Sequence, residues 1–219
     1  MNSLRVEVEK LRQKGAVLEI EYGEFINQDN SMGNFRRTKL LKMDCYDSDF
    51  IQADFYRASI KRVSFENCDI MGSNFEKARL IDINFACADL TGSNMFRLFA
   101  EELNCNQVIL VGCNLDRAEL VRSSFIDADL RGSDMKGADL SLSNFTGANL
   151  SEVDFTGAKL DGCNFAGAIL EGARLWDVST VNTNFNMARG VDIPDIHTHV
   201  ANVMCGRRVG QDFRPRCRK

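Results

Sequence analysis

The sequence predicts an all-β fold, a right-handed quadrilateral parallel β-helix of about eight coils with short helical caps. Two periods predict it. One is a period of five residues that runs from about residue 18 to residue 188 without a change of register. The other is a period of twenty residues, at which similar residues recur. Neither fits an α-helix or an ordinary strand, whose side chains repeat every 3.6 and 2 residues.

The five-residue period places one large apolar residue in every repeat. In the C-terminal half these residues are Leu110, Leu115, Leu120, Phe125, Leu130, Met135, Leu140, Phe145, Leu150, Phe155, Leu160, Phe165 and Leu170. Two positions earlier stands a small residue, mostly alanine or serine, and Asp, Asn or Ser usually lies between them. The chain satisfies this pattern by turning through about a right angle every five residues, with two side chains per side pointing inward.

The twenty-residue period follows if four such sides close one coil, because residues twenty apart then stack in neighbouring coils. One inward column is mostly aromatic: Phe25, Cys45, Phe65, Phe85, Cys105, Phe125, Phe145, Phe165 and Phe185. The adjoining sides hold leucine and isoleucine instead. A five-residue period alone does not require this alternation, so the four-sided coil has independent support.

Residues 128–165, ADLRGSDMKGADLSLSNFTGANLSEVDFTGAKLDGCNF, resemble the pentapeptide-repeat family, whose loose motif is A(D/N)Lxx. The resemblance covers about 170 of the 219 residues. It implies the quadrilateral β-helix and very little about activity.

We expect three segments: a capping helix at 1–17, the β-helix at 18–190, and a helical cap with a basic tail at 191–219. Caps are expected because a bare end coil exposes strand edges and apolar side chains. Ser3 is the expected N-cap of the first helix and Gly15 its stop. The inward face of that helix is expected to hold Leu4, Val8 and Leu11.

The composition predicts a soluble protein but does not indicate what class of partner it binds. The net charge is −4, and no apolar run is long enough to span a membrane. The first thirty residues are charged and lack the apolar core of a signal peptide. We expect a cytoplasmic protein with reduced cysteines, and secretion without a cleaved signal is a further possibility.

The sequence shows no arrangement of residues for catalysis and no glycine-rich phosphate loop, so we expect a non-enzymatic protein without a cofactor. His197 and His199 lie near Cys205 and Cys217, a composition that raises the question of zinc. On a helix, side chains two positions apart point about 200° apart, so we expect no metal site. The C-terminal segment could instead form the contact of a dimer.

Five cysteines fall at positions of the repeat that point into the coil. Cys45 and Cys105 replace phenylalanine, whereas Cys68, Cys113 and Cys163 occupy small-residue slots. We expect all five to be buried fillers. The recurring Asp and Asn residues are expected to hydrogen-bond the turns.

The outward columns are more informative about function. We define the basic ladder as five cations in five successive coils: Arg37, Arg57, Lys77, Arg97 and Arg117. Stacked like charges repel, so the ladder needs counter-charges or a partner. An acidic column runs along another side: Asp29, Asp49, Asp69, Asp89 and Asp129.

A second anomaly lies at 96–111, where apolar residues fall on phases that elsewhere are polar. These are Phe96, Phe99, Ile109 and Val111. We expect either one exposed contact surface, local repacking that turns them inward, or cover by a terminal segment.

The favoured function is an interaction scaffold that offers the basic ladder and the 96–111 residues to a protein partner. The family resemblance adds an alternative, a DNA-mimicking rod that binds DNA gyrase or topoisomerase IV and protects it from quinolones or inhibits it. The basic ladder departs from such a uniformly acidic surface, and no direct nucleic-acid-binding motif is present. A secreted bacterial effector is the third hypothesis.

Overall fold

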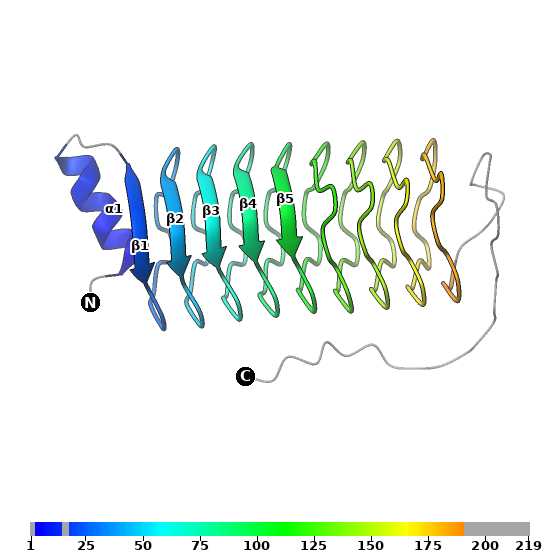
Figure 1. The fold of residues 1–219 in the computed structure, drawn as a ribbon, viewed down its shortest axis with the longest axis horizontal. Helices are drawn as coiled ribbons and strands as arrows, with labels where there is room; N and C mark the ends of the chain where they lie inside the picture. Colours follow the sequence, from blue (N-terminus) through cyan, green and yellow to red (C-terminus); the bar gives the residue numbers. More distant parts are fainter. Residues whose placement is uncertain (1–2, 15–17, 191–219) are drawn as a thin grey trace.

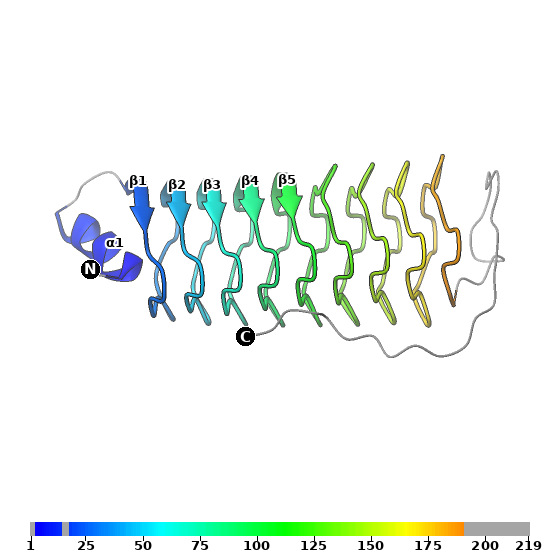
Figure 2. The same ribbon diagram turned by 60° about the horizontal axis from the view of Figure 1, so that its bottom comes forward.

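The computed structural model describes residues 3–14 and 18–190 as a straight rod of stacked coils with one helix at its N-terminal end (Figures 1 and 2). The helix is α1, Leu4–Gln13. Five strands then occupy the same side of successive coils: β1 (Glu19–Glu24), β2 (Lys39–Asp44), β3 (Ser59–Ser64), β4 (Arg79–Asn84) and β5 (Phe99–Asn104).

The strands form one parallel sheet in the order β1-β2-β3-β4-β5. Each residue pairs with the residue twenty positions later, as in Glu19 with Lys39. The twenty-residue period is therefore the length of one coil. The structure confirms the predicted fold class of a parallel β-solenoid.

The sheet is shorter than the expected eight coils. Regular strands span only the four steps from β1 to β5, whereas the later coils are joined by single bridges such as Phe99 with Glu119 and Ile169 with Arg189. The difference has a local cause. In β1–β5 one corner lies within the strand, with a positive φ at its second residue, as at Glu102, and after β5 the same corner is a turn.

The core is the interior of the coils. Phenylalanines twenty residues apart lie face to face, with ring centroids 4.8 Å apart for Phe35 and Phe55 and 4.9 Å for Phe145 and Phe165. Buried aromatic pairs of this kind add about 0.5–1.5 kcal/mol beyond the area they bury. Cys105, at 3% exposure, replaces a ring in the same column. A small apolar cavity adjoins it, bordered also by Phe85 and Phe125.

Each coil turns at corners made of two residues, and the second corner residue has a positive φ. At Arg57 and Arg97, for example, φ is 55° and 53°. An Asp or Asn before the corner accepts a hydrogen bond from the first corner residue, as Asp54 Oδ1 does from the Tyr56 N–H at 3.0 Å. The structure thus bears out the expected turn-bonding role of these residues.

Helix α1 covers the first coil. Leu4 and Val8 are buried in the core, and Leu11 is half-buried. Ser3 occupies the N-cap position without a side-chain capping bond. The Arg5 N–H donates to Asn30 Oδ1 at 3.0 Å, which fixes the helix on the coil beneath it.

The expected C-terminal cap, the basic tail and the histidine and cysteine residues at 197–217 lie outside the described residues. Within residues 3–14 and 18–190, no helix has the length and apolar character needed to cross a bilayer.

Candidate functional site

The basic ladder occupies the second position of one corner in five successive coils. The backbone N–H of each rung donates to the first corner residue of the next coil, at 3.0 Å from Arg57 to Glu76 O and from Lys77 to Phe96 O. The matching bond from Arg117 to Lys136 O measures 2.8 Å. These bonds hold the five cations at the spacing of the coils.

The ladder is largely exposed and only partly neutralised. Lys77 is half-buried, whereas the four arginines are exposed. Lys77 Nζ lies 2.6 Å from Glu76 Oε1, and Arg117 Nε lies 3.7 Å from Asp116 Oδ1. Both partners are neighbours in the chain, so the pairs do not tie one coil to another.

Two aromatic rings stand beside the ladder. The Tyr56 ring has the Arg57 guanidinium 5.2 Å and Lys77 Nζ 5.7 Å from its centroid, and Arg36 lies over it at 4.4 Å. Phe96 lies 5.1 Å from the Arg97 guanidinium. Both contacts are within cation–π range. Phe96 therefore belongs to the ladder corner.

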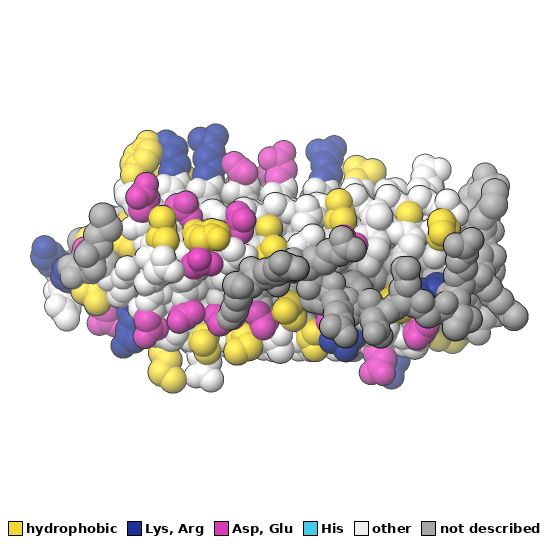
Figure 3. All heavy atoms as spheres, turned by 90° about the horizontal axis from the view of Figure 1, so that it is seen from below, with side chains coloured by type: hydrophobic (Ala, Val, Ile, Leu, Met, Phe, Trp, Pro, Cys, Tyr) yellow, Lys and Arg dark blue, Asp and Glu magenta, His cyan; other side chains and the backbone are white. Residues whose placement is uncertain are grey.

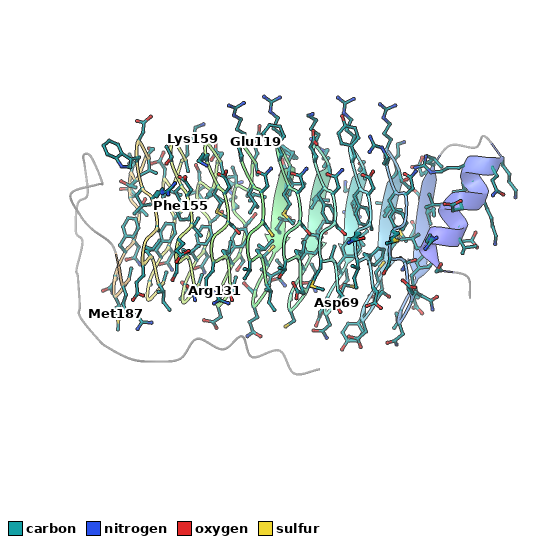
Figure 4. The ribbon with its side chains drawn as sticks, turned by 180° about the vertical axis from the view of Figure 1, so that it is seen from behind. Asp69, Glu119, Arg131, Phe155, Lys159 and Met187 are labelled. Atoms are coloured by element: carbon teal, nitrogen blue, oxygen red, sulfur yellow. The ribbon has the colours of Figure 1, made fainter. Side chains whose placement is uncertain are left out.

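The structure places the apolar residues at 96–111 on more than one side of the rod. Phe99 pairs with Glu119, and Ile109 pairs with Asp89, which continues the column of Asp69. Glu119 lies along the upper edge of the rod and Asp69 along the lower edge (Figure 4). Phe99 and Ile109 are ten residues apart, which is half a coil, so they lie on opposite sides.

The other two apolar residues, Phe96 and Val111, lie at corners of the coil. Phe96 lies at the ladder corner and Val111 at the next corner round, beside Ile109. All four side chains are half-buried, so none has been turned fully into the core. The chain therefore has two small apolar interruptions on different sides.

Asp69, a member of the acidic column, lies along the lower edge of the rod (Figure 4), and seen from below, Asp and Glu side chains gather over the N-terminal half (Figure 3). The carboxylates of the column also serve the fold. Asp29 Oδ1 accepts the Ser31 N–H at 2.9 Å, and that backbone hydrogen bond lowers the pKa of Asp29. Asp129 is buried and binds Arg131 through two oxygens, with Nη2 2.8 Å from Oδ2. The free negative charge is therefore smaller than the sequence implies.

The five inward cysteines are buried free thiols, as expected. Those in small-residue slots also donate to a carbonyl of the preceding coil, as Cys113 Sγ does to Leu90 O at 3.0 Å. Burial raises the pKa of Cys68, Cys113 and Cys163 to about 12. Such thiols pack and are unreactive.

The described part of the chain holds no group of three or more His, Cys, Asp or Glu side chains placed to bind a metal. What the described surface offers chemically is a row of cations, a turn-bonded acidic column and scattered apolar side chains.

Comparisons with known proteins agree with this geometry. The model of the family described as pentapeptide repeats matches eight copies within residues 34–67, 102–137 and 138–177, half of the chain. No curated protein matches it.

Three solved structures are similar to this chain. HetL, a pentapeptide repeat protein involved in heterocyst differentiation regulation from the cyanobacterium Nostoc sp. strain PCC 7120, is 20% identical over 86% of this chain and 94% of its own, with a TM-score of 0.47. A trypsin-treated variant of QnrB1, a plasmid-mediated fluoroquinolone resistance protein, is 20% identical over 75% and 83%, with a TM-score of 0.44. Rfr23 from the cyanobacterium Cyanothece 51142 is 16% identical over 83% and 99%, with a TM-score of 0.25.

Fold and surface together define a four-sided parallel β-solenoid whose distinguishing features lie on its outside. The chain belongs to the pentapeptide-repeat family.

Proposed function

We propose that the protein is a non-enzymatic interaction scaffold that binds an acidic surface of a partner protein along the basic ladder. The observation that carries this proposal is the succession of five cations at one corner of five consecutive coils. Within the described residues, only two of the rungs, Lys77 and Arg117, form ion pairs. The charge that remains complements an acidic partner.

The backbone conformation of the rungs is that of the other corners. The rungs sit at positive φ, where a side chain costs an L-residue roughly 1–2 kcal/mol. The same column continues with Gly137 and Gly157, for which a positive φ carries no such cost. Other corners hold non-glycine residues at a positive φ as well, such as Asn67 and Gln107, so the conformation is general in this fold and the charge alone distinguishes the ladder.

A protein partner fits better than a nucleic acid. The ladder covers about 19 Å, four coil intervals of about 4.8 Å. The other sides carry the acidic column, and the whole chain has a net charge of −4. A long polyanion would be repelled beyond the ladder, whereas a compact acidic patch would not.

The test compares two triple variants of the full chain. One reverses rungs, Arg57→Glu, Lys77→Glu and Arg97→Glu; the control reverses cations outside the ladder, Lys14→Glu, Lys42→Glu and Lys61→Glu. Proteins captured by the wild type are identified by mass spectrometry, and their affinity for each variant is then measured at low and high salt. We expect the ladder variant alone to lose at least tenfold in affinity, because like charges across an interface oppose association. Equal affinity for both variants would refute the proposal.

The alternative of a DNA-mimicking rod that binds DNA gyrase or topoisomerase IV rests on the acidic column. Two observations count against it: Asp29 lends an oxygen to its turn, and Asp129 is neutralised by Arg131. A gyrase supercoiling assay with and without ciprofloxacin separates the two functions. A change in supercoiling or in drug sensitivity on adding the protein would favour the alternative.

A further inference from the structure

The stacking of coils is interrupted at one corner beside β5. Elsewhere the N–H of the second corner residue donates to the next coil, as from Arg97 to Asp116 O at 3.0 Å and from Gln107 to Ile126 O at 2.8 Å. Between β5 and the next coil, the backbone bonds stop at Ala100 N–H to Glu119 O.

These bonds resume at Ser124 N–H to Leu103 O, 2.9 Å long, and continue with Cys105 N–H to Ser124 O, 2.7 Å long. At this step a corner that lies within a strand, at 101–102, is followed by a turn at 121–122. The N–H of Glu102 and the C=O of Val121 therefore do not pair with each other, although their equivalents at neighbouring corners do.

A surface groove of about 420 Å³ opens at this step. Phe99, Ala100 and Val121 form its apolar lining. Glu101 and Glu102 from β5 and Glu119 from the next coil add three exposed carboxylates, whereas one cation, Arg122, also lines it. No ion pair of these three glutamates is found within the described residues. The groove is thus lined by apolar side chains together with three carboxylates and one cation.

The chemistry of the groove selects an organic cation over a metal ion. Its carboxylates are not among any group of three acidic or metal-binding side chains placed to hold a metal in the described chain. The Phe99 ring already has the Arg79 guanidinium 4.3 Å from its centroid, so its environment accommodates a planar cation. A guanidinium stacks on aromatic rings and pairs with carboxylates through several N–H groups, whereas an ammonium is a more strongly hydrated point charge.

We propose that this groove binds an arginine side chain on an extended basic segment of a partner protein. The guanidinium pairs with the glutamates, and its stem packs on Phe99 and Val121. The partner backbone pairs with the Glu102 N–H and the Val121 C=O, which do not pair with each other. The groove volume is within the range of natural ligand pockets, about 300–1,000 Å³. This site is separate from the proposed ladder function and of opposite charge.

The probe is a fluorescein-labelled peptide, Gly-Ser-Arg-Val-Arg-Ser-Gly, titrated into the full-length protein by fluorescence anisotropy. Backbone amide shifts are followed by NMR in a parallel titration. We expect saturable binding, with the largest shifts at Glu102 and Val121. Glu101→Gln with Glu119→Gln should weaken binding about tenfold, because charge-assisted hydrogen bonds become neutral ones. The matched control is Glu152→Gln with Glu171→Gln, two exposed glutamates outside the groove.

A version of the peptide with lysine in place of both arginines should bind more weakly than the arginine peptide. Equal weakening by the control pair, equal affinity for the two peptides, shifts centred on the acidic column, or no binding at millimolar peptide would overturn the proposal. The ladder variant of the preceding section should keep its affinity for this peptide. The two proposals therefore fail independently.

Discussion

At the scale of single residues, each position in the five-residue repeat has one task. The large residue fills the coil, the Asp or Asn before the corner accepts a turn hydrogen bond, and the small residue leaves room for the chain to bend. At most small-residue slots that carry a hydroxyl or thiol, this group donates to the carbonyl 23 residues earlier, as Ser73 Oγ does to Phe50 O at 2.6 Å; Ser123 Oγ is an exception. Polar atoms in the core are thus tolerated where a carbonyl is within reach.

The burial of the small-slot thiols can be tested by alkylation. In the folded protein, iodoacetamide at pH 8.5 should leave Cys68, Cys113 and Cys163 unmodified, because burial raises their pKa to about 12 from an ordinary 9.0. In urea all three should react, as judged by mass spectrometry of peptides. Rapid modification under native conditions would show that the coils open on that timescale.

The same pKa shift gives a pH dependence of stability. A group whose folded-state pKa is raised favours the fold while it stays protonated, so its contribution is complete below about pH 9 and is lost between pH 9 and 12. Replacing Cys113 and Cys163 with alanine should flatten the fall in melting temperature across that window. An identical slope in the variant would contradict the assignment.

At the scale of elements, α1 and β5 depart from the repeat in different ways. The helix ends the stack by covering the first coil, and β5 marks the place where a corner changes conformation. The first departure is visible in the sequence, since apolar residues spaced by three or four replace the period of five. The second is not, because the corner residues Glu102 and Arg122 both adopt a positive φ and neither is glycine.

The cap can be tested on the two faces of the helix. Val8 is 1% exposed and Val6 is 39% exposed. Val8→Asp should detach the helix, because burying an unpaired carboxylate costs more than about 2 kcal/mol. Val6→Asp should be nearly neutral. Hydrogen exchange within residues 4–13 reports detachment, and sedimentation velocity reports whether the uncovered coil self-associates.

Some features of the surface can be predicted from the sequence and others cannot. The ladder and the acidic column follow from counting in twenties, because the register never changes. The same counting separates Phe99 from Ile109 by half a coil, so the sequence already indicates that the two lie on opposite sides of the rod. The groove could not be predicted from the sequence, because it lies where backbone hydrogen bonds between 101–102 and 121–122 are missing.

At the scale of the whole molecule, the rod is a series of nearly equivalent layers, each in contact mainly with its two neighbours. Stability in such a fold is close to a sum over layers and the interfaces between them. A change that removes one complete layer should therefore be tolerated, whereas one that alters the register should not.

Deletion of residues 140–159 removes one coil and brings Phe165 next to Phe125 in the same inward column. We expect the shortened protein to keep its β-sheet circular dichroism and to melt cooperatively at a somewhat lower temperature. Deletion of residues 140–157 instead shifts every later residue off its slot and should abolish folding of the C-terminal coils. Similar melting of both proteins would refute a strict register.

The spacing of the ladder also restricts the geometry of any partner. Its rungs repeat with the coils, at about 4.8 Å, whereas turns of an α-helix repeat at about 5.4 Å. A helix lying parallel to the rod would fall out of step by about 2.4 Å over the four intervals of the ladder. Acidic side chains on a straight helix can thus meet neighbouring rungs but not all five, unless the helix crosses the rod obliquely. Another solenoid, whose layers share the spacing of this one, could match the entire row.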